Sequence, residues 1–346
     1  MRAATVVPGE PQRAGVSERP DPEPAVGELL VEGLLVGVCG TDHEVAHGGH
    51  GALPPGASDM VAFHESLGRV LTAPAGSGFA AGDLVAGVVR RPDPVPCGPC
   101  AAGEWDYCRN GRYTERGIKR LDGYGAQRWT VPAGFAVRVD PGLGDLGVLT
   151  EPASVVAKAW EQVDRISSRS VSRGHVTLVT GAGPIGLLAA LLSVQRGLTT
   201  HVLDRATSGP KPDLVRSLGA TYHSALPDDL EPDVVIEATG AAQLVFDVLG
   251  RTGPNAVTVL TGLSGSRRTV TLAAGSINDE LVLDNDVVVG SVNANLRHYR
   301  AAADALAAAD PAWLGGLLTR RVPLASWTDA LSRADGDVKV IVDLRE

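Results

Sequence analysis

The stretch from residue 175 to residue 204 constrains the fold more than any other part of this 346-residue chain. It starts with the apolar run HVTLVT, continues through a glycine turn, GAGPIG, and enters LLAALLSVQRGL, which has helical periodicity. A second apolar run, THVLD, ends it. Strand, tight turn, helix and strand in this order predict a β-α-β unit with two parallel strands.

The same alternation continues downstream. DVVIEATG (233–240) and AVTVLTG (256–262) read as further strands, and LVFDVLG (244–250) between them reads as a helix. Strands that alternate with helices predict a doubly wound parallel sheet of the Rossmann type. Residues 1–150 instead contain short apolar runs separated by glycine, proline and aspartate, which is typical of a β-rich domain. We therefore predict an α/β protein of two domains.

The tail is harder to assign. From Tyr299 an alanine-rich helix is followed by WLGGLLTRRVPLASWTDALSRA, interpreted as an amphipathic helix, and by the strand VKVIVDL (338–344). These elements can complete either domain. The run LVLDNDVVVGSV (281–292) is expected at a sheet edge, where pairing with a second copy would give a homodimer or homotetramer.

The glycine turn indicates dinucleotide binding. Glycines at this spacing, between a strand and a helix, let a pyrophosphate approach the backbone at the helix N-terminus. Asp204 stands where a carboxylate accepts hydrogen bonds from the adenosine ribose, which favours NAD. Arg205, with Lys211, can instead accommodate the 2′-phosphate of NADP. The predicted cofactor-binding residues are Gly181, Gly183, Pro184, Ile185, Gly186, Asp204, Arg205, Thr239 and Asn293.

Two short motifs predict a catalytic zinc site. GVCGTDHE contains Cys39 and FHE contains His64 and Glu65, so a thiolate, an imidazole and a carboxylate are available to one ion. The third protein ligand is either Glu65 or Glu151. Zinc with an open position polarises a substrate hydroxyl, and the Thr41 hydroxyl can relay its proton. An ordinary buried thiol and a hydrogen-bonded core imidazole are the structural alternatives.

A second cysteine cluster follows at CGPC. Cys97, Cys100 and Cys108 offer three thiolates, whereas a structural zinc usually has four ligands. Asp93 is the nearest candidate for the fourth; a water molecule, or no metal at all, remains open.

The charge and hydropathy patterns argue against several other functions. A net charge of −9 gives no basic surface for nucleic acid or anionic membrane. The first residues lack the apolar core of a signal peptide, and no run of eighteen apolar residues occurs. We therefore expect a soluble, cytoplasmic protein with a small-molecule substrate and without nucleic-acid or membrane partners.

GVCGTDHE, the His-Glu pair, the CGPC lobe, LTEPASV and GAGPIG together resemble the zinc-dependent medium-chain dehydrogenase/reductase superfamily. YTERGIKRLDGYGAQ and GSVNANLRHY make the chain similar to its glucose 1-dehydrogenase branch. This resemblance implies a GroES-like catalytic domain at 1–155 and 299–346 and a Rossmann domain at 156–298.

The resemblance also implies roles for single residues. It places Cys39, His64 and Glu151 around the catalytic zinc, with Glu65 as an alternate or water-mediated ligand and Thr41 as the relay. His43 would assist catalysis, Glu115, Glu151 and Asn293 would contact the sugar, and Glu44 counts against simple alcohols as substrates.

Three positions depart from that branch. Pro94 stands near the place of a fourth lobe cysteine, Val89 precedes Arg90 where relatives carry asparagine, and Asp204–Arg205 replaces a motif linked to NADP.

The expected activity is hydride transfer between C1 of a glucose-like aldose and a nicotinamide cofactor, with NAD favoured over NADP. Within the same class, the substrate would instead be a polyol, cyclitol, aminosugar or threonine-like amino alcohol. In a different class, the chain would be a catalytically retired dinucleotide-binding protein.

Overall fold

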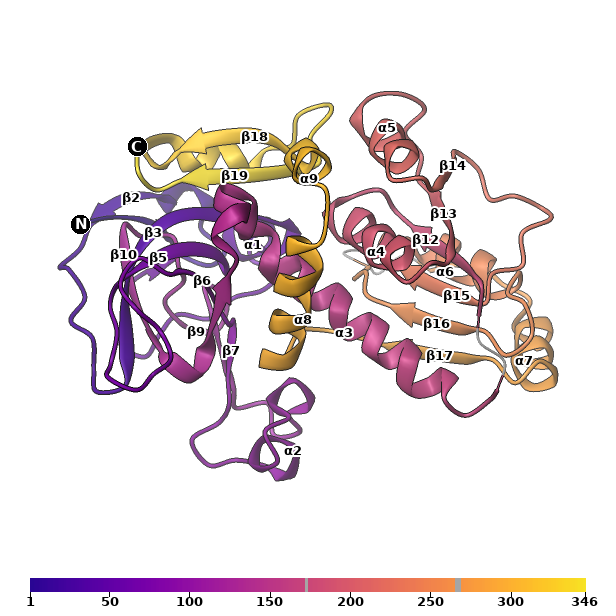
Figure 1. The fold of residues 1–346 in the computed structure, drawn as a ribbon, viewed down its shortest axis with the longest axis horizontal. Helices are drawn as coiled ribbons and strands as arrows, with labels where there is room; N and C mark the ends of the chain where they lie inside the picture. Colours follow the sequence, from indigo (N-terminus) through magenta and orange to yellow (C-terminus); the bar gives the residue numbers. More distant parts are fainter. Residues whose placement is uncertain (172–173, 265–268) are drawn as a thin grey trace. The chain divides into compact units, whose positions relative to one another are not determined.

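The structure is a computed structural model that describes residues 1–171, 174–264 and 269–346. Its contacts divide the chain into two compact units. The first consists of Met1–Ser154 with Asn293–Glu346, and the second is Val155–Val292. Figure 1 labels most of the helices and strands of both. The predicted α/β class is confirmed, because strands dominate the first unit and alternate with helices in the second.

Short strands build the first unit. They are β1 (Arg2–Val6), β2 (Gly15–Glu18), β3 (Glu28–Val38), β4 (Met60–Val61), β5 (Glu65–Thr72), β6 (Leu84–Gly87), β7 (Arg90–Arg91), β8 (Thr114–Arg116), β9 (Arg120–Leu121), β10 (Arg128–Pro132), β11 (Ala136–Val139), β18 (Leu318–Pro323) and β19 (Lys339–Asp343). The largest sheet has the order β11-β6-β5-β3-β19-β18, and β10 also pairs with β3. Strand β3 is central because it pairs with β5, β10 and β19. Its second half is almost fully buried.

The helices of the first unit are α1 (Gly40–His47), α2 (Gly98–Ala101), α8 (Leu296–Ala307) and α9 (Pro311–Leu317), and α3 (Thr150–Ser167) crosses the boundary between the units. Its core gathers large aromatic side chains: Phe63 meets Trp327 edge to face at 5.2 Å, and Tyr124 meets Trp129 at 4.7 Å. Trp327 comes from the tail of the chain. The tail therefore belongs to the core of the first unit.

The pairing of β19 settles where the tail goes. Strand β19 runs antiparallel to β3 and parallel to β18. The predicted amphipathic helix after residue 312 is wrong: α9 ends at Leu317, β18 follows, and a 3₁₀ segment, η5 (Leu324–Leu331), comes next. Partners for β18 that lie outside its own sequence override the local helical pattern.

The second unit contains a parallel sheet. Its strands are β12 (Val176–Thr180), β13 (Thr199–Leu203), β14 (Thr221–His223), β15 (Val234–Glu237), β16 (Val257–Leu260) and β17 (Val287–Gly290), in the order β14-β13-β12-β15-β16-β17. Its helices are α4 (Pro184–Gln195), α5 (Pro210–Ser217), α6 (Ala242–Leu249) and α7 (Ala274–Leu283). The order of strands reverses at β12, the doubly wound arrangement that places a ligand at the carboxyl ends of the central strands.

Two predicted segments differ in detail. Of the run 281–292, only Val287–Gly290 is a strand; it does lie at the edge of the sheet, but Leu281–Leu283 end helix α7. Residues 293–298, placed above with the Rossmann domain, make their contacts in the first unit, where Asn295 Nδ2 donates to Asp106 Oδ1 at 2.8 Å. Among the described residues, no helix has the length and apolar character needed to cross a membrane.

Candidate functional site

The ends of two strands bring the predicted metal ligands together. Cys39 follows β3, His64 precedes β5, and the register pairs Gly37 of β3 with Glu65 of β5. Gly37 is required for this packing, because a Cβ atom there would lie 2.0 Å from Glu65 Oε2. Phe63, just before His64, adopts a positive φ of 71°, a strained conformation for a bulky residue.

Cys39 and His64 face each other in the first unit. Cys39 Sγ lies 3.2 Å from His64 Nε2, and Thr41 N donates to the same sulfur at 3.3 Å. Asp42, which sequence analysis missed, touches both ligands: its Oδ2 accepts from Cys39 N at 2.8 Å, and its Oδ1 lies 3.3 Å from His64 Nδ1. Its position in the first turn of α1, three residues after Cys39, was the available signal.

Electrostatics tie these groups together. Burial, helped by the charge of Asp42, raises the pKa of the Cys39 thiol above its ordinary value. Burial acts to lower the pKa of His64, but the charges of Cys39 and Asp42 outweigh it and leave the pKa well above its usual value. A cation bound here would replace the protons that these two groups hold.

Glu65 and Glu151 lie beside this pair. One ligand atom from each of Cys39, His64 and Glu65 falls within 4.8 Å of the others. Glu65 also forms an ion pair with Lys339, the first residue of β19, and Lys339 Nζ donates to Val38 O at 3.0 Å. Lys339 was missed by sequence analysis, although a lysine that interrupts an apolar strand was a visible signal.

Glu151 is the other candidate for the third ligand. It lies in the first turn of α3, and its side chain is buried. Burial raises the pKa of Glu151 to about 7, and the charges of His64 and Glu65 also act on it. The structure therefore places two carboxylates near the Cys39–His64 pair, with Glu65 already engaged by a cation.

The donors fit a zinc ion. Zinc prefers thiolate, imidazole and carboxylate ligands. The contact of Asp42 with His64 Nδ1 leaves Nε2 directed at the thiol, which is the arrangement that carboxylates give to zinc-bound histidines.

The other predicted residues of the catalytic unit occupy different places. Thr41 is half-buried beside the Cys39 sulfur. His43 is exposed on α1, where its ring stacks on His47 at 4.0 Å. Glu44 is half-buried, with its Oε2 3.1 Å from His50 Nε2.

Glu115 and Asn293 are brought together although they are distant in sequence. Asn293 Nδ2 donates to Glu115 Oε1 at 3.0 Å, and Arg90 Nε donates to the same oxygen at 3.1 Å. Asn293 has a positive φ of 61°, so it is also a turn former. Arg90 is buried, and its guanidinium lies over the ring of Tyr113. The departure at Val89 and Arg90 was expected to reshape the sugar pocket, but the contact of Arg90 with Glu115 was not predicted. These side chains form a polar cluster able to hydrogen-bond hydroxyl groups.

The glycine turn lies at the carboxyl end of β12. Gly181 has a φ of +90°, and a Cβ atom on Gly186 would lie 1.7 Å from Gly181 O. Pro184 and Ile185 open helix α4. Thr239 lies next to this turn, since its Cγ2 would be 2.9 Å from a Cβ on Gly181. A turn this tight, at the start of a helix, has the form of the glycine turns that bind the pyrophosphate of a dinucleotide.

Asp204 follows β13 and braces this turn. Its Oδ2 accepts from Ala182 N at 2.8 Å, and its Oδ1 accepts from Ala206 N at 3.0 Å. Burial opposes ionisation, but these two N–H groups and Lys211 lower the pKa of Asp204. Arg205 is exposed beside it.

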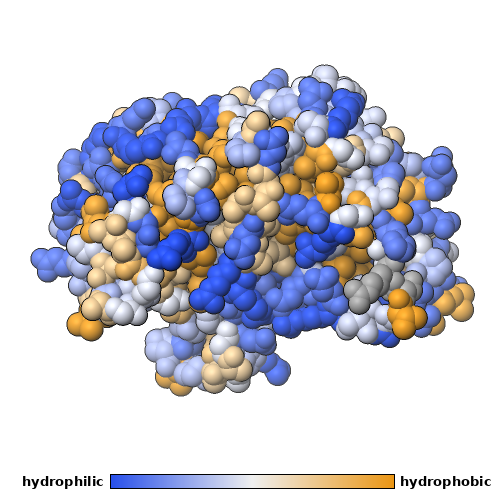
Figure 2. Space-filling model, viewed as in Figure 1, coloured by the Kyte–Doolittle hydropathy of each residue, from blue (hydrophilic) through white to orange (hydrophobic). Residues whose placement is uncertain are grey.

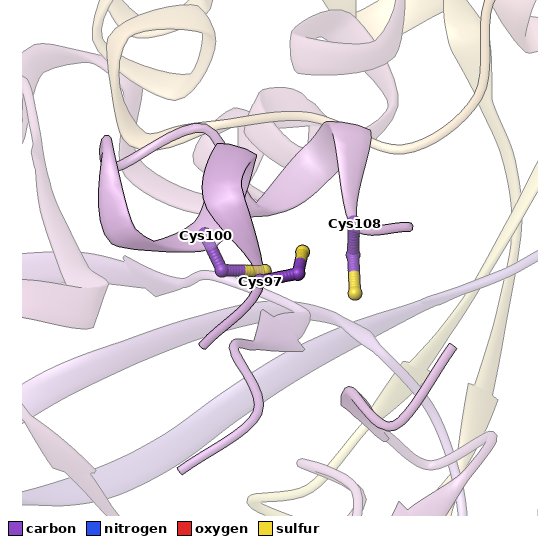
Figure 3. Close-up of side chains that lie close together, drawn as sticks. All are labelled: Cys97, Cys100 and Cys108. Atoms are coloured by element: carbon purple, nitrogen blue, oxygen red, sulfur yellow. The ribbon is translucent and has the colours of Figure 1, made fainter. Parts of the chain in front are cut away.

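Cys97, Cys100 and Cys108 also come together, as Figure 3 shows, with their sulfurs within 4.8 Å of one another. Asp93, the predicted fourth ligand, is engaged elsewhere: its Oδ1 accepts from Val95 N at 3.0 Å and its Oδ2 accepts from Arg112 Nε at 2.8 Å. Among the histidine, cysteine and acidic residues that the structure describes, no fourth ligand atom joins the three sulfurs. They do not match the four-ligand form of a structural zinc site.

Comparisons with known proteins show which family the chain resembles. Residues 25–141 match the alcohol dehydrogenase GroES-like domain, and residues 144–344 match the glucose dehydrogenase C-terminus. The chain is 39% identical to a glucose 1-dehydrogenase of Thermoproteus tenax, covering 100% of both chains, and 40% identical to one of Halobacterium salinarum, covering 94% of both.

A solved structure is similar over the same length. It is the Haloferax mediterranei glucose dehydrogenase in complex with NADP, Zn and gluconolactone, with a TM-score of 0.91, 33% identity and 99% of both chains covered. The resemblance stated from the sequence is confirmed: the chain belongs to the glucose dehydrogenase family of the zinc-dependent medium-chain dehydrogenases.

Proposed function

We propose that this enzyme oxidises a glucose-like aldose at C1 and passes the hydride to a nicotinamide dinucleotide. One observation carries the proposal: a thiol, an imidazole and a carboxylate with ligand atoms within 4.8 Å of one another, at Cys39, His64 and Glu65. Such a set binds zinc at an open catalytic site. The names of the similar proteins, glucose 1-dehydrogenases, support the substrate class.

In this proposal Cys39, His64 and either Glu65 or Glu151 hold the zinc, which, when bound, polarises the substrate hydroxyl and eases loss of its proton. Thr41 Oγ1 is the group we assign to receive that proton, because the Thr41 backbone amide already contacts the Cys39 sulfur. Asp42 holds Cys39 N and the His64 ring in place. The ion pair of Glu65 with Lys339 supports Glu151 as the third ligand, whereas the grouping of ligand atoms within 4.8 Å includes Glu65 and not Glu151.

Sugar binding is assigned to Glu115 and Asn293. The Glu115 carboxylate is held through Oε1 by Arg90 and Asn293, which leaves Oε2 available to accept from a hydroxyl group. A fixed acceptor discriminates well, since the wrong epimer leaves it without a partner. His43, exposed on α1, is kept only as an outer residue near the site.

The dinucleotide is assigned to the turn Gly181–Gly186, with Asp204, Arg205 and Thr239 beside it. The nicotinamide accepts the hydride when the cofactor is bound. Asp204 favours NAD, but the similar structure solved with a cofactor contains NADP, so the comparisons give that preference no support. The exposed Arg205 offers a partner for a 2′-phosphate. With a unit boundary near Ser154 and Val292, the residues assigned to the sugar belong to the first unit and those assigned to the dinucleotide belong to the second.

A panel of aldoses, polyols, cyclitols and amino alcohols, assayed with NAD⁺ and NADP⁺ on zinc-loaded protein, tests the assignment. We expect turnover of glucose or an epimer of it, and a rise of KM by about tenfold or more in Glu115→Gln, because a charged acceptor is replaced by a neutral amide. Glu18→Gln, at a carboxylate with 79% side-chain exposure, is the matched control and keeps the wild-type KM. Turnover of amino alcohols but of no sugar would refute the substrate class.

A further inference from the structure

The cysteine lobe, Cys97–Cys108, is a second chemical centre that sugar oxidation does not use. Cys97 precedes helix α2, Cys100 lies in it and Cys108 follows in the next loop, and their sulfur atoms lie within 4.8 Å of one another (Figure 3). Hydrophilic residues and some hydrophobic ones cover the part of the surface around α2 in Figure 2. Cys97 and Cys108 are partly exposed there, and Cys100 is buried. All three cysteines are free thiols.

The described residues around the three cysteines make hydrogen bonds and ion pairs of their own and supply no fourth ligand. Asn110 occupies the space beside Cys108: its Oδ1 accepts from Cys108 Sγ at 3.0 Å, and its Nδ2 donates to Asp93 Oδ2 at 2.5 Å. Arg112 pairs with the same carboxylate. Asp93 is therefore held away from the sulfurs by two donors, and Pro94 has no ligand atom to offer.

The two cysteines of the CGPC turn differ in their environments. Cys97 is partly exposed, and its Sγ accepts from Arg109 N at 3.4 Å. Cys100, three residues later, is buried. An accessible sulfur that receives N–H donors, followed across two residues by a buried thiol, is the arrangement of dithiols that exchange with disulfides.

The protonation of the pair follows the same asymmetry. Backbone N–H groups of Arg109 and Cys100 lower the pKa of Cys97 to about 6, whereas burial raises the pKa of Cys100 to about 12. Cys97 is thus the attacking sulfur and Cys100 the resolving one.

We propose that Cys97 and Cys100 form a peroxide-reactive dithiol that closes to an intramolecular disulfide. The Cys97 thiolate attacks the terminal oxygen of a hydroperoxide; an S–O bond forms, the O–O bond breaks, and the alkoxide leaves as an alcohol after taking up a proton. Cys100 sulfur then attacks Cys97 sulfur, the S–S bond forms and water leaves. Two thiols supply the two electrons that reduce the hydroperoxide to alcohol and water.

Cys108 has a different part in this scheme. Its thiol donates to Asn110 Oδ1 at 3.0 Å, so the sulfur is engaged by this amide. It stays reduced while the CGPC pair closes, and it distinguishes this proposal from random oxidation of the cluster.

Peptide mass spectrometry on the zinc-loaded full-length enzyme tests the proposal. The protein is treated with a stoichiometric amount of hydrogen peroxide, and free thiols are then blocked with N-ethylmaleimide. Trypsin leaves the three lobe cysteines in one peptide, so a second cleavage after Glu104 is needed to separate Cys108. We expect loss of two of the four thiols and a fall of about 2 Da in the CGPC peptide, reversed by dithiothreitol.

Three variants sharpen the result. In Cys100→Ser, Cys97 should stop at the sulfenic acid, which dimedone traps; Cys97→Ser should lose no thiol; and Cys108→Ser should form the disulfide at the wild-type rate. Circular dichroism checks that each variant is folded. The measurement on the wild-type enzyme tests the proposal even if a variant does not fold. Oxidation that reaches Cys108 or Cys39 before Cys97 would overturn the proposal. A second zinc per chain that protects the lobe until a chelator removes it would overturn it as well.

Discussion

Replacing Lys339 by methionine tests the buried ion pair that joins the tail to Glu65 in the proposed metal site. The side chains of Lys339 and Glu65 are 1% and 3% exposed. Burial acts to lower the pKa of Lys339, but the charges of Glu65 and Cys39 reverse the effect and raise it, so the lysine is held as a cation. Methionine fills much of the same space without the charge, so Glu65 is left as an uncompensated anion.

The magnitude follows from the burial of both partners. Removing one member of a buried pair costs about 3–5 kcal/mol of unfolding free energy, because the remaining charge has no water around it. The hydrogen bond from Lys339 Nζ to Val38 O at 3.0 Å is lost as well. Stated as an equilibrium, the ratio of folded to unfolded protein should fall by roughly two to three and a half powers of ten.

Urea unfolding in the presence of a chelator measures this cost without a contribution from bound metal. Arg13→Met, which removes an ion pair with Glu10 whose side chains are 50% and 44% exposed, is the matched control and should leave the midpoint almost unchanged. The double variant Glu65→Gln/Lys339→Met should recover most of the loss, since neither buried charge remains. A Lys339→Met midpoint equal to that of the control, or a double variant as unstable as the single one, would refute the reasoning.

Three further outcomes are expected. Asp42→Asn should weaken zinc binding by about 10–100-fold in a chelator competition assay, because both ligand contacts of the carboxylate are altered; unchanged affinity would contradict its orienting role. His201 Nδ1 and His223 Nε2 lie 2.8 Å apart, and burial lowers the pKa of both side chains. The unfolded chain therefore binds more protons than the folded chain in the ordinary histidine range. The free energy of unfolding should fall as the pH drops through that range. His201→Gln/His223→Gln should flatten that part of the pH profile in thermal unfolding, and an unchanged slope would exclude the pair as its source. Gly186→Ala should abolish dinucleotide binding in calorimetry, since its Cβ would overlap Gly181 O, and retained affinity would show that the turn can relax.

The fold was predictable where the signal was local. The glycine turn after an apolar strand, followed by a helix and a second strand, led to the parallel sheet, because each step of a β-α-β unit is written in consecutive residues. Strand β3 coincides with the apolar run ELLVEGLLVGV (28–38), one of the short runs of residues 1–150 from which strands were predicted. Strand β18 was not, although Leu318–Val322 alternate between less and more exposed positions. Its period of two was hidden by the leucine-rich residues just before it, which form helix α9.

The candidate site was predictable only as a set of residue types. Cys39 and His64 were named from their motifs, but their meeting depends on the register of β3 with β5. The part played by Lys339 depends on a third strand from the far end of the sequence, which no local pattern reveals. Arg90 likewise gains its meaning only when β7 pairs with β8 and brings it to Glu115. Non-local pairing, not residue chemistry, set the limit.

The central place of β3 has a consequence for how the protein is made. The proposed zinc ligands Cys39 and His64 are synthesised early, yet the strand that lies against β3 and carries Lys339 is synthesised after nearly all of the described chain. A nascent chain therefore carries the thiol, the imidazole and two carboxylates for most of translation without the cation that neutralises Glu65. During that interval β3 has an open edge, and pairing of this edge with another chain competes with native folding. When β19 pairs with β3, it covers this edge and at the same time brings the Lys339 cation to the Glu65 carboxylate in the proposed metal site.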